Sequence, residues 1–163
     1  MIKLRRITLA LILAVPLALG ACGAPAEPIA LQVVIKFEGT PPYPNNALAT
    51  QGGVGTSCFV PTDGFLRASP TDKNYFMLEG TQAQLTDADT GKILSLSKVP
   101  IGSVTSEKDL PQGREYTCQW KFAFDKVPLE SAFYNMSIGD ESFPKFTASD
   151  FEPDNKIEFT ITN

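Results

Sequence analysis

Residues 116–125, Tyr-Thr-Cys-Gln-Trp-Lys-Phe-Ala-Phe-Asp, are the stretch that decides the fold of this chain of 163 residues. Aromatic side chains and a cysteine occupy every second position, and smaller or polar side chains stand between them. Because successive side chains of a β-strand point to opposite faces, this period of two predicts a strand with one buried face. So large an apolar face predicts a hydrophobic core beneath it. Its members are Tyr116, Cys118, Trp120, Phe122 and Phe124.

Short strands are predicted on both sides of this stretch, separated by turns rich in Gly, Pro and Asp. Residues 87–91 would be the turn of a hairpin, with Gly91 supplying a positive φ. Residues 104–110 are polar and predict a loop, and residues 147–151 predict one helical turn. The further predicted strands are residues 31–38, 75–78, 82–86, 92–97, 132–138 and 156–162.

These elements predict an all-β fold, a single β-sandwich of about seven short antiparallel strands over residues 30–163. A small barrel is the alternative. The strand at residues 116–125 favours the sandwich, because its aromatic face needs a second sheet opposite it. No long helical period, internal repeat or low-complexity tract interrupts this pattern.

The first 21 residues predict a signal peptide. A basic start with Lys3, Arg5 and Arg6 precedes an apolar run over residues 7–19. That run has the length of a signal-peptide core and is short for a transmembrane helix.

Leu19-Gly20-Ala21-Cys22 closes the apolar run and resembles the lipobox of bacterial prolipoproteins. The resemblance implies that Cys22 takes a diacylglycerol and becomes the new N-terminus. Residues 22–29, rich in Ala and Pro, would then be a lipidated tether. The expected location is the extracytoplasmic face of a bacterial membrane, either the cell membrane or an outer membrane.

Cys58 and Cys118 are predicted to form one disulfide. They are the pair left when the lipid uses Cys22, and an exported domain lies in an oxidising compartment. Reactive thiols are the alternative, but the chain has no C-x-x-C pair and no histidine to lower a thiol pKa. The bond would pin the glycine-rich residues 52–66 against the strand at residues 116–125.

Two further resemblances concern the domain. Residues 87–94 resemble the D-x-x-T/S-G-K-x-L hairpin of exported prealbumin-like and Ig-like modules. Residues 58–162 are similar in layout to small envelope proteins, mostly of actinobacteria. These resemblances imply a β-sandwich fold and an envelope location, and they imply no activity. The layout consists of Cys58, residues 86–92, residues 118–124, Phe133-Tyr134 and residues 157–161.

The charge of the chain bears on its partners. Three of the 14 basic residues and none of the 18 acidic residues precede Cys22, so the remainder has a net charge of −7. Nucleic-acid binding requires a cationic surface, so a nucleic-acid partner is not expected. Attachment to a membrane should likewise depend on the acyl chains.

Catalytic and metal-binding residues are not predicted. The chain has no histidine, so it cannot build a Ser/His/Asp or Cys/His arrangement. Asp87 and Asp89 do not fit a calcium loop, because Gly91 and Lys92 occupy ligand and glycine positions. Two pairs of neighbouring acids, Asp140-Glu141 and Glu152/Asp154, are interpreted as solvated turns. No cofactor is expected.

Five aromatic residues lie in loops beside Pro or Gly. They predict either a contact patch on the rigid sandwich or a plug at the end of its core. The plug is the favoured interpretation, and the patch remains the candidate binding surface. The residues are Tyr43, Phe59, Phe65, Phe143 and Phe146.

The function expected from these observations is non-enzymatic. The protein would be an anchored lipoprotein with a binding or accessory role, with another envelope protein as a possible partner. The alternatives are an envelope hydrolase that uses paired carboxylates, and a purely structural envelope component. A cleft with buried carboxylates would favour the hydrolase.

Overall fold

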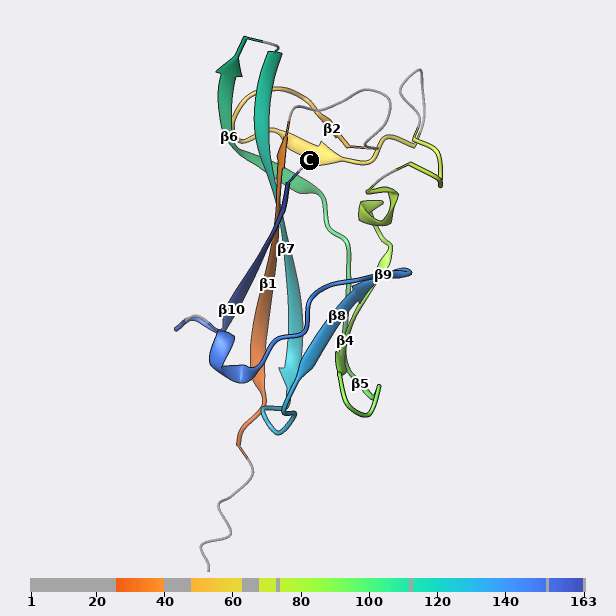
Figure 1. Ribbon diagram of the computed structural model, residues 1–163, viewed down its shortest axis with the longest axis vertical. Helices are drawn as coiled ribbons and strands as arrows, with labels where there is room; N and C mark the ends of the chain where they lie inside the picture. The colour runs from red at the N-terminus through yellow and green to blue at the C-terminus, as the bar shows by residue number, and fades with distance from the viewer. Residues whose placement is uncertain are drawn as a thin grey trace, which may run out of the picture.

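The computed structural model describes residues 26–39, 48–62, 68–72, 74–111, 113–151 and 153–162. These residues form two β-sheets packed as a sandwich (Figure 1), which confirms the predicted fold class. The six-stranded sheet has the order β10-β1-β7-β6-β3-β2, and the four-stranded sheet has the order β5-β4-β8-β9. The strands are β1 Ile29–Gly39, β2 Ala49–Thr50, β3 Ser57–Phe59, β4 Gln82–Asp87, β5 Ile93–Lys98, β6 Gly102–Leu110, β7 Gly113–Val127, β8 Tyr134–Ile138, β9 Glu141–Ser142 and β10 Lys156–Thr162.

The described part of the chain therefore has ten strands, three more than the seven or so predicted. Two of the additional strands, β2 and β9, contain two residues each. Such short strands leave no readable alternation in a sequence, because a period of two needs several residues to appear.

The face of β7 is as the alternation predicts. Cys118, Trp120, Phe122 and Phe124 are 3% exposed or less, whereas Lys121 on the opposite face is exposed. Tyr116 is half-buried because it lies toward the β6–β7 hairpin, beyond the second sheet. The sequence stretch that decides the fold thus supplies the centre of its core.

One pairing differs from the prediction of antiparallel strands. β1 pairs with β7 antiparallel, but it pairs with β10 parallel, in a register that places Val33 beside Ile157. The reason is the path of the chain after β9, where residues 143–151 and 153–155 lead back to the end of the sandwich at which β1 begins (Figure 1). The amide of Gln32 donates a hydrogen bond to the carbonyl of Asn155, 2.9 Å away, at the point where β10 begins to pair with β1.

Two elements were predicted wrongly. Residues 75–78 are not a strand, because Tyr75–Met77 forms a 3-10 helix, η1. Asn74 before it has a left-handed backbone conformation, and its carbonyl accepts a hydrogen bond from the amide of Met77 at 2.9 Å. An apolar run of four residues cannot distinguish these two structures by period alone.

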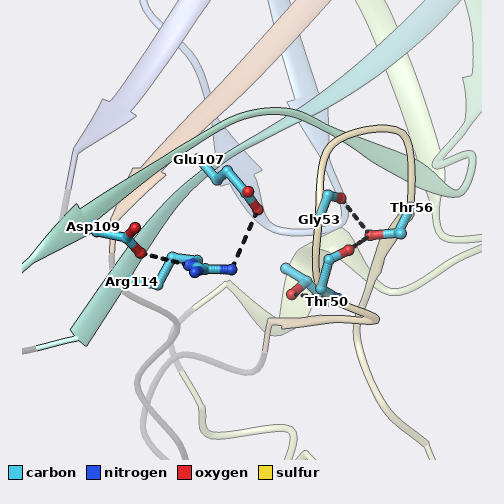
Figure 2. Close-up of polar contacts among 7 residues, drawn as sticks. Thr50, Gly53, Thr56, Glu107, Asp109 and Arg114 are labelled. Carbon is cyan, nitrogen blue, oxygen red and sulfur yellow. Dashed lines mark hydrogen bonds and ion pairs between the residues drawn. The ribbon is translucent and has the colours of Figure 1, made fainter.

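Residues 104–110 are not a loop, because they belong to β6. Residues 105–109 are exposed, so this part of β6 has no buried face to produce an apolar alternation. Its pairing with β7 fixes the strand instead, and the hairpin projects from the sandwich (Figure 1). Figure 2 shows Arg114 of β7 beside Asp109 and Glu107 of β6, at 2.7 and 3.8 Å.

The other predicted elements are confirmed. β4 and β5 form the predicted hairpin, and the turn at residues 139–140 joins β8 to β9. A single 3-10 turn, η2 at Ala148–Asp150, begins with a capping box between Thr147 and Asp150. The carboxylate of Asp150 accepts a hydrogen bond from the Thr147 amide at 2.6 Å, which lowers the pKa of that carboxyl group.

Cys58 and Cys118 form the predicted disulfide, with their Cα atoms 6.0 Å apart and both residues buried. The bond joins β3 to β7, two strands of the same sheet that lie on either side of β6. An immunoglobulin disulfide differs, because it joins the two sheets of the sandwich. The segment at residues 50–56 leads into β3 and is tied to β6 by hydrogen bonds between Gly55 and Val104 and between Thr56 and Val104.

Candidate functional site

A cavity of about 690 Å³ opens on the side of the sandwich where three segments meet. The first is the stretch that leads into η1, the second is the turn between β8 and β9, and the third is the end of β10. The end of β10 lies beside the end of β1, since Ile161 is paired with Phe37. The cavity therefore lies toward the end of the sandwich opposite the start of β1.

Aromatic side chains form the apolar part of the cavity wall. Tyr75 and Phe76 come from η1, and Phe143 follows β9. The rings of Phe76 and Phe143 meet edge to face, with their centroids 6.2 Å apart. This contact joins η1 to the β8–β9 hairpin, so the wall is built by packing between the two segments.

Carboxylates form the polar part of the wall. Asp140 and Glu141 lie in and just after the turn that Gly139 makes possible with its φ of 56°, and both are exposed. Asp72 is half-buried, and its carboxylate accepts a hydrogen bond from the Ser69 amide at 2.6 Å. Of the described residues that line the cavity, none is basic. The described carboxylates therefore give this part of the wall a negative charge.

Asn74 is the most unusual residue of the wall. It is 5% exposed, its backbone φ is 66°, and its Nδ2 atom is screened from water with no hydrogen-bond partner. A buried donor without an acceptor is rare in folded proteins, and left-handed backbone conformations of residues other than Gly gather at functional sites. Asn74 therefore marks this cavity as the candidate site.

The carboxylates of the wall are exposed or half-buried. A pair of carboxylates that acts as general acid and base needs burial to separate the two pKa values, but Asp140 and Glu141 are exposed. The hydroxyl of Ser142 donates a hydrogen bond to the Oδ1 atom of Asn135 at 3.1 Å. A serine nucleophile needs a base as its hydrogen-bond partner, and the amide of Asn135 is not a base.

Metal binding finds no support in the described ranges. Within them, no group of three or more His, Cys, Asp or Glu side chains lies close enough to hold a metal ion. The Asp87 carboxylate binds its own turn: it accepts hydrogen bonds from the amides of Asp89 and Thr90 and from the Thr90 hydroxyl. This is the structural role that the sequence analysis favoured for the turn.

Two of the five loop aromatics lie in the core. Phe143 and Phe146 are 8% and 4% exposed, and both rings contact Phe159 of β10, with centroids 5.4 and 5.9 Å away. Phe146 also stacks on Tyr134, whose burial raises the pKa of its hydroxyl group. These two side chains close the side of the sandwich between β8 and β10, which is the packing that the plug interpretation describes, and Phe143 also lines the cavity.

Of the other loop aromatics, the structure describes Phe59 alone. Phe59 lies half-buried on β3 and lines a second cavity of about 560 Å³, together with Ile101, which is 55% exposed. Tyr43 and Phe65 lie outside the described residues, as do Cys22 and the predicted signal peptide.

The sequence analysis missed most of the candidate site. It noted Asp140 and Glu141 as a solvated turn, and it placed Tyr75 and Phe76 in a strand. The Asn74-Tyr75-Phe76 run contains a residue type that tolerates left-handed backbone, which is the one local signal that could have indicated a bend there. Nothing in the sequence indicates that this bend meets the β8–β9 turn.

Comparisons with known proteins give no relative for this chain: no family model matches it, and neither a curated protein nor a solved structure is similar to it. None of the helical turns in the described part of the chain has the length and hydropathy of a membrane-spanning helix.

Proposed function

We propose that this protein is an extracytoplasmic lipoprotein, held at a bacterial membrane by a lipid on Cys22, and that its β-sandwich has a non-enzymatic binding or accessory role in the cell envelope. The observation that carries the binding role is the cavity between η1, the β8–β9 turn and the end of β10. It combines aromatic walls with exposed carboxylates, which is a composition that recognises a ligand without providing an acid and base for catalysis.

Two further observations support the proposed location. The buried bond between Cys58 and Cys118 fits a protein that folds in an oxidising compartment. The cavity and the start of β1 lie toward opposite ends of the sandwich, so a tether that precedes β1 would leave the cavity facing away from the membrane.

The location is tested by the substitution Cys22→Ser. We expect the variant either to leave the membrane fraction or to accumulate unprocessed, because serine cannot form the thioether with the lipid. The measurement is fractionation of cells with a high-salt wash, together with the mass of the purified protein. Gly23→Ser, which changes the neighbouring residue and keeps the thiol, is the matched control. A Cys22→Ser protein that is cleaved and still resists the salt wash would show that the anchor is not this lipid.

A further inference from the structure

The outer edge of the larger sheet is formed by β10 (Figure 1), and the end of this strand lies beside the cavity at η1. We propose that this edge binds an extended segment of another polypeptide, which pairs with β10 as an added strand and places an apolar side chain against the cavity wall. The inference rests on the binding role proposed above and names the class of partner.

Among the described strands, β10 is the one sheet edge that is long and regular. The other edge strands are β2, β5 and β9, and β2 and β9 contain two residues each. The pairing of β5 shifts register between Leu85 and Thr86 of β4, and the Ser95 hydroxyl of β5 donates a hydrogen bond to the carbonyl of Asp125 in β7. Short strands and bulges protect an edge from pairing with another chain. β10 pairs with β1 over seven consecutive residues without a shift, so its edge has neither protection.

The ladder between β1 and β10 determines which peptide groups face the edge. Because the amide of Gln32 donates a hydrogen bond to the carbonyl of Asn155, the parallel ladder directs the peptide groups of the odd-numbered residues of β10 toward β1. The amides and carbonyls of Glu158, Thr160 and Thr162 therefore point away from β1, and no described group forms a hydrogen bond with them. Such backbone groups are the chemistry that recognises an extended polypeptide.

Apolar side chains on the inner side of β10 continue into the cavity wall. The ring of Phe159 lies 5.4 Å from that of Phe143, and both Phe143 and Ile161 line the cavity. Phe159 and Ile161 are half-buried, since no described strand pairs with β10 on their edge side. Side chains of an added strand alternate between its faces, so every second one would lie on this inner side. An apolar side chain beside Ile161 would bury apolar surface and reach the cavity.

A segment of a different protein fits this edge better than a second copy of the chain. Two identical edges form a closed pair when they are antiparallel. Such a pair, centred on Phe159, would place the starts of the two β1 strands about 40 Å apart along the strands. In the proposed anchored form, residues 22–28 join the lipid to β1 and can span at most about 25 Å. Two copies whose strands stand upright on one membrane therefore cannot pair in this way, and another envelope protein has no such restriction.

The test follows the backbone amides of β10 by NMR while a synthetic peptide is added to the purified protein. The probe is acetyl-Lys-Thr-Val-Thr-Phe-Thr-Val-Thr-Lys-amide, which alternates polar and apolar residues around one central ring. In the free protein, the amides of Glu158, Thr160 and Thr162 should exchange rapidly with water. With the peptide bound, their exchange should slow by about tenfold or more, and the odd-numbered amides should change little. We expect a dissociation constant below about 1 mM.

Matched probes and variants separate the backbone contact from the side-chain contact. N-methylation of two neighbouring central residues blocks both edges of the peptide and should weaken binding about tenfold or more. Replacement of the central Phe by Ser keeps the backbone and should weaken binding about fivefold or more. Thr160→Pro removes an edge amide without removing a bond to β1, and edge strands accept proline. It should weaken binding about threefold or more, whereas Thr160→Ala should stay within about 1.5-fold of the wild type.

Thermal unfolding verifies that Thr160→Pro is folded, and the N-methylated peptide tests the same contact on the unchanged protein. The proposal is overturned by no binding up to about 5 mM, by equal binding of either altered peptide, by equal effects of the two substitutions, or by slow exchange of the three edge amides in the free protein. A wild-type dimer that Thr160→Pro converts to a monomer would assign the edge to a second copy and refute the proposed partner. Resonance shifts at residues 139–143 without shifts in β10 would keep the binding role of the cavity and refute strand pairing. Failure of these tests leaves the Cys22→Ser result, and with it the location, intact.

Discussion

Gly102 lies directly against the indole ring of Trp120. A Cβ atom added to Gly102 would lie 2.4 Å from Cε2 of Trp120, far inside contact distance. Trp120 is 1% exposed at the centre of β7, so the ring cannot swing aside without displacing the core. Space, and not backbone conformation, therefore requires glycine at this position.

Gly102→Ala should lower the free energy of unfolding by about 1–3 kcal/mol, the range for overpacking a well-packed core. The measurement is urea denaturation at neutral pH. Ser103→Ala changes the next residue, which is exposed, and should have an effect of no more than about 0.5 kcal/mol. Equal effects of the two substitutions would mean that Trp120 does not lie against β6.

The turn between β4 and β5 shows how a single carboxylate organises an element. Hydrogen bonds from the Ser131 side chain, and then from the amide and hydroxyl of Thr90, lower the pKa of Asp87 from 3.8 to about 2. The Ser131 contact also connects the turn to the segment that precedes β8. The sequence predicted the turn from Asp87 and Gly91, but the contact from Ser131 is a tertiary one.

This pKa predicts a loss of stability in acid. The ionised form of Asp87 is favoured by folding, so its contribution is fully present above the ordinary pKa of 3.8 and is lost as the pH falls through about 2. Asp87→Asn should therefore be less stable than the wild type at pH 7, and the difference should shrink as the pH falls from 3.8 through about 2. Thermal unfolding across this pH range measures it. Asp89→Asn in the same turn should keep the wild-type dependence, and a constant difference between wild type and Asp87→Asn would refute the assignment.

On the scale of the whole molecule, the disulfide holds the least regular part of the chain against the most regular one. β3 is joined to its neighbours β2 and β6 by two residue pairs each, whereas β7 is paired along most of its length with β1 and β6. The bond from Cys58 to Cys118 closes a loop of 60 residues, which stabilises the fold by roughly 4 kcal/mol in the chain-entropy account.

Reduction of this bond should therefore loosen β3 first. We expect amide exchange to accelerate more in residues 52–62 than in residues 116–124, because few backbone hydrogen bonds hold the former once the bond is open. Hydrogen exchange with and without reductant measures the difference, and β8, which lies in the other sheet, is the internal control. Uniform acceleration in all three segments would mean that the bond supports the whole sandwich.

The sequence by itself determined the fold class, the buried face of β7, the β4–β5 hairpin and the partner of Cys58. Each of these follows from a pattern that neighbouring residues carry, such as the alternation at residues 116–125, or from the pairing of two cysteines. The candidate lipidation of Cys22 is likewise a property of the sequence alone.

Only the tertiary structure decided the rest. The parallel pairing of β10 with β1 depends on the path of the chain between β9 and β10. β6 is a strand because β7 pairs with it, without an apolar period of its own. The cavity exists because η1 meets the β8–β9 turn, more than sixty residues away along the chain. Local patterns reflect which face of an element is buried, whereas a site is made where distant segments meet, and that meeting is set by the packing of the whole core.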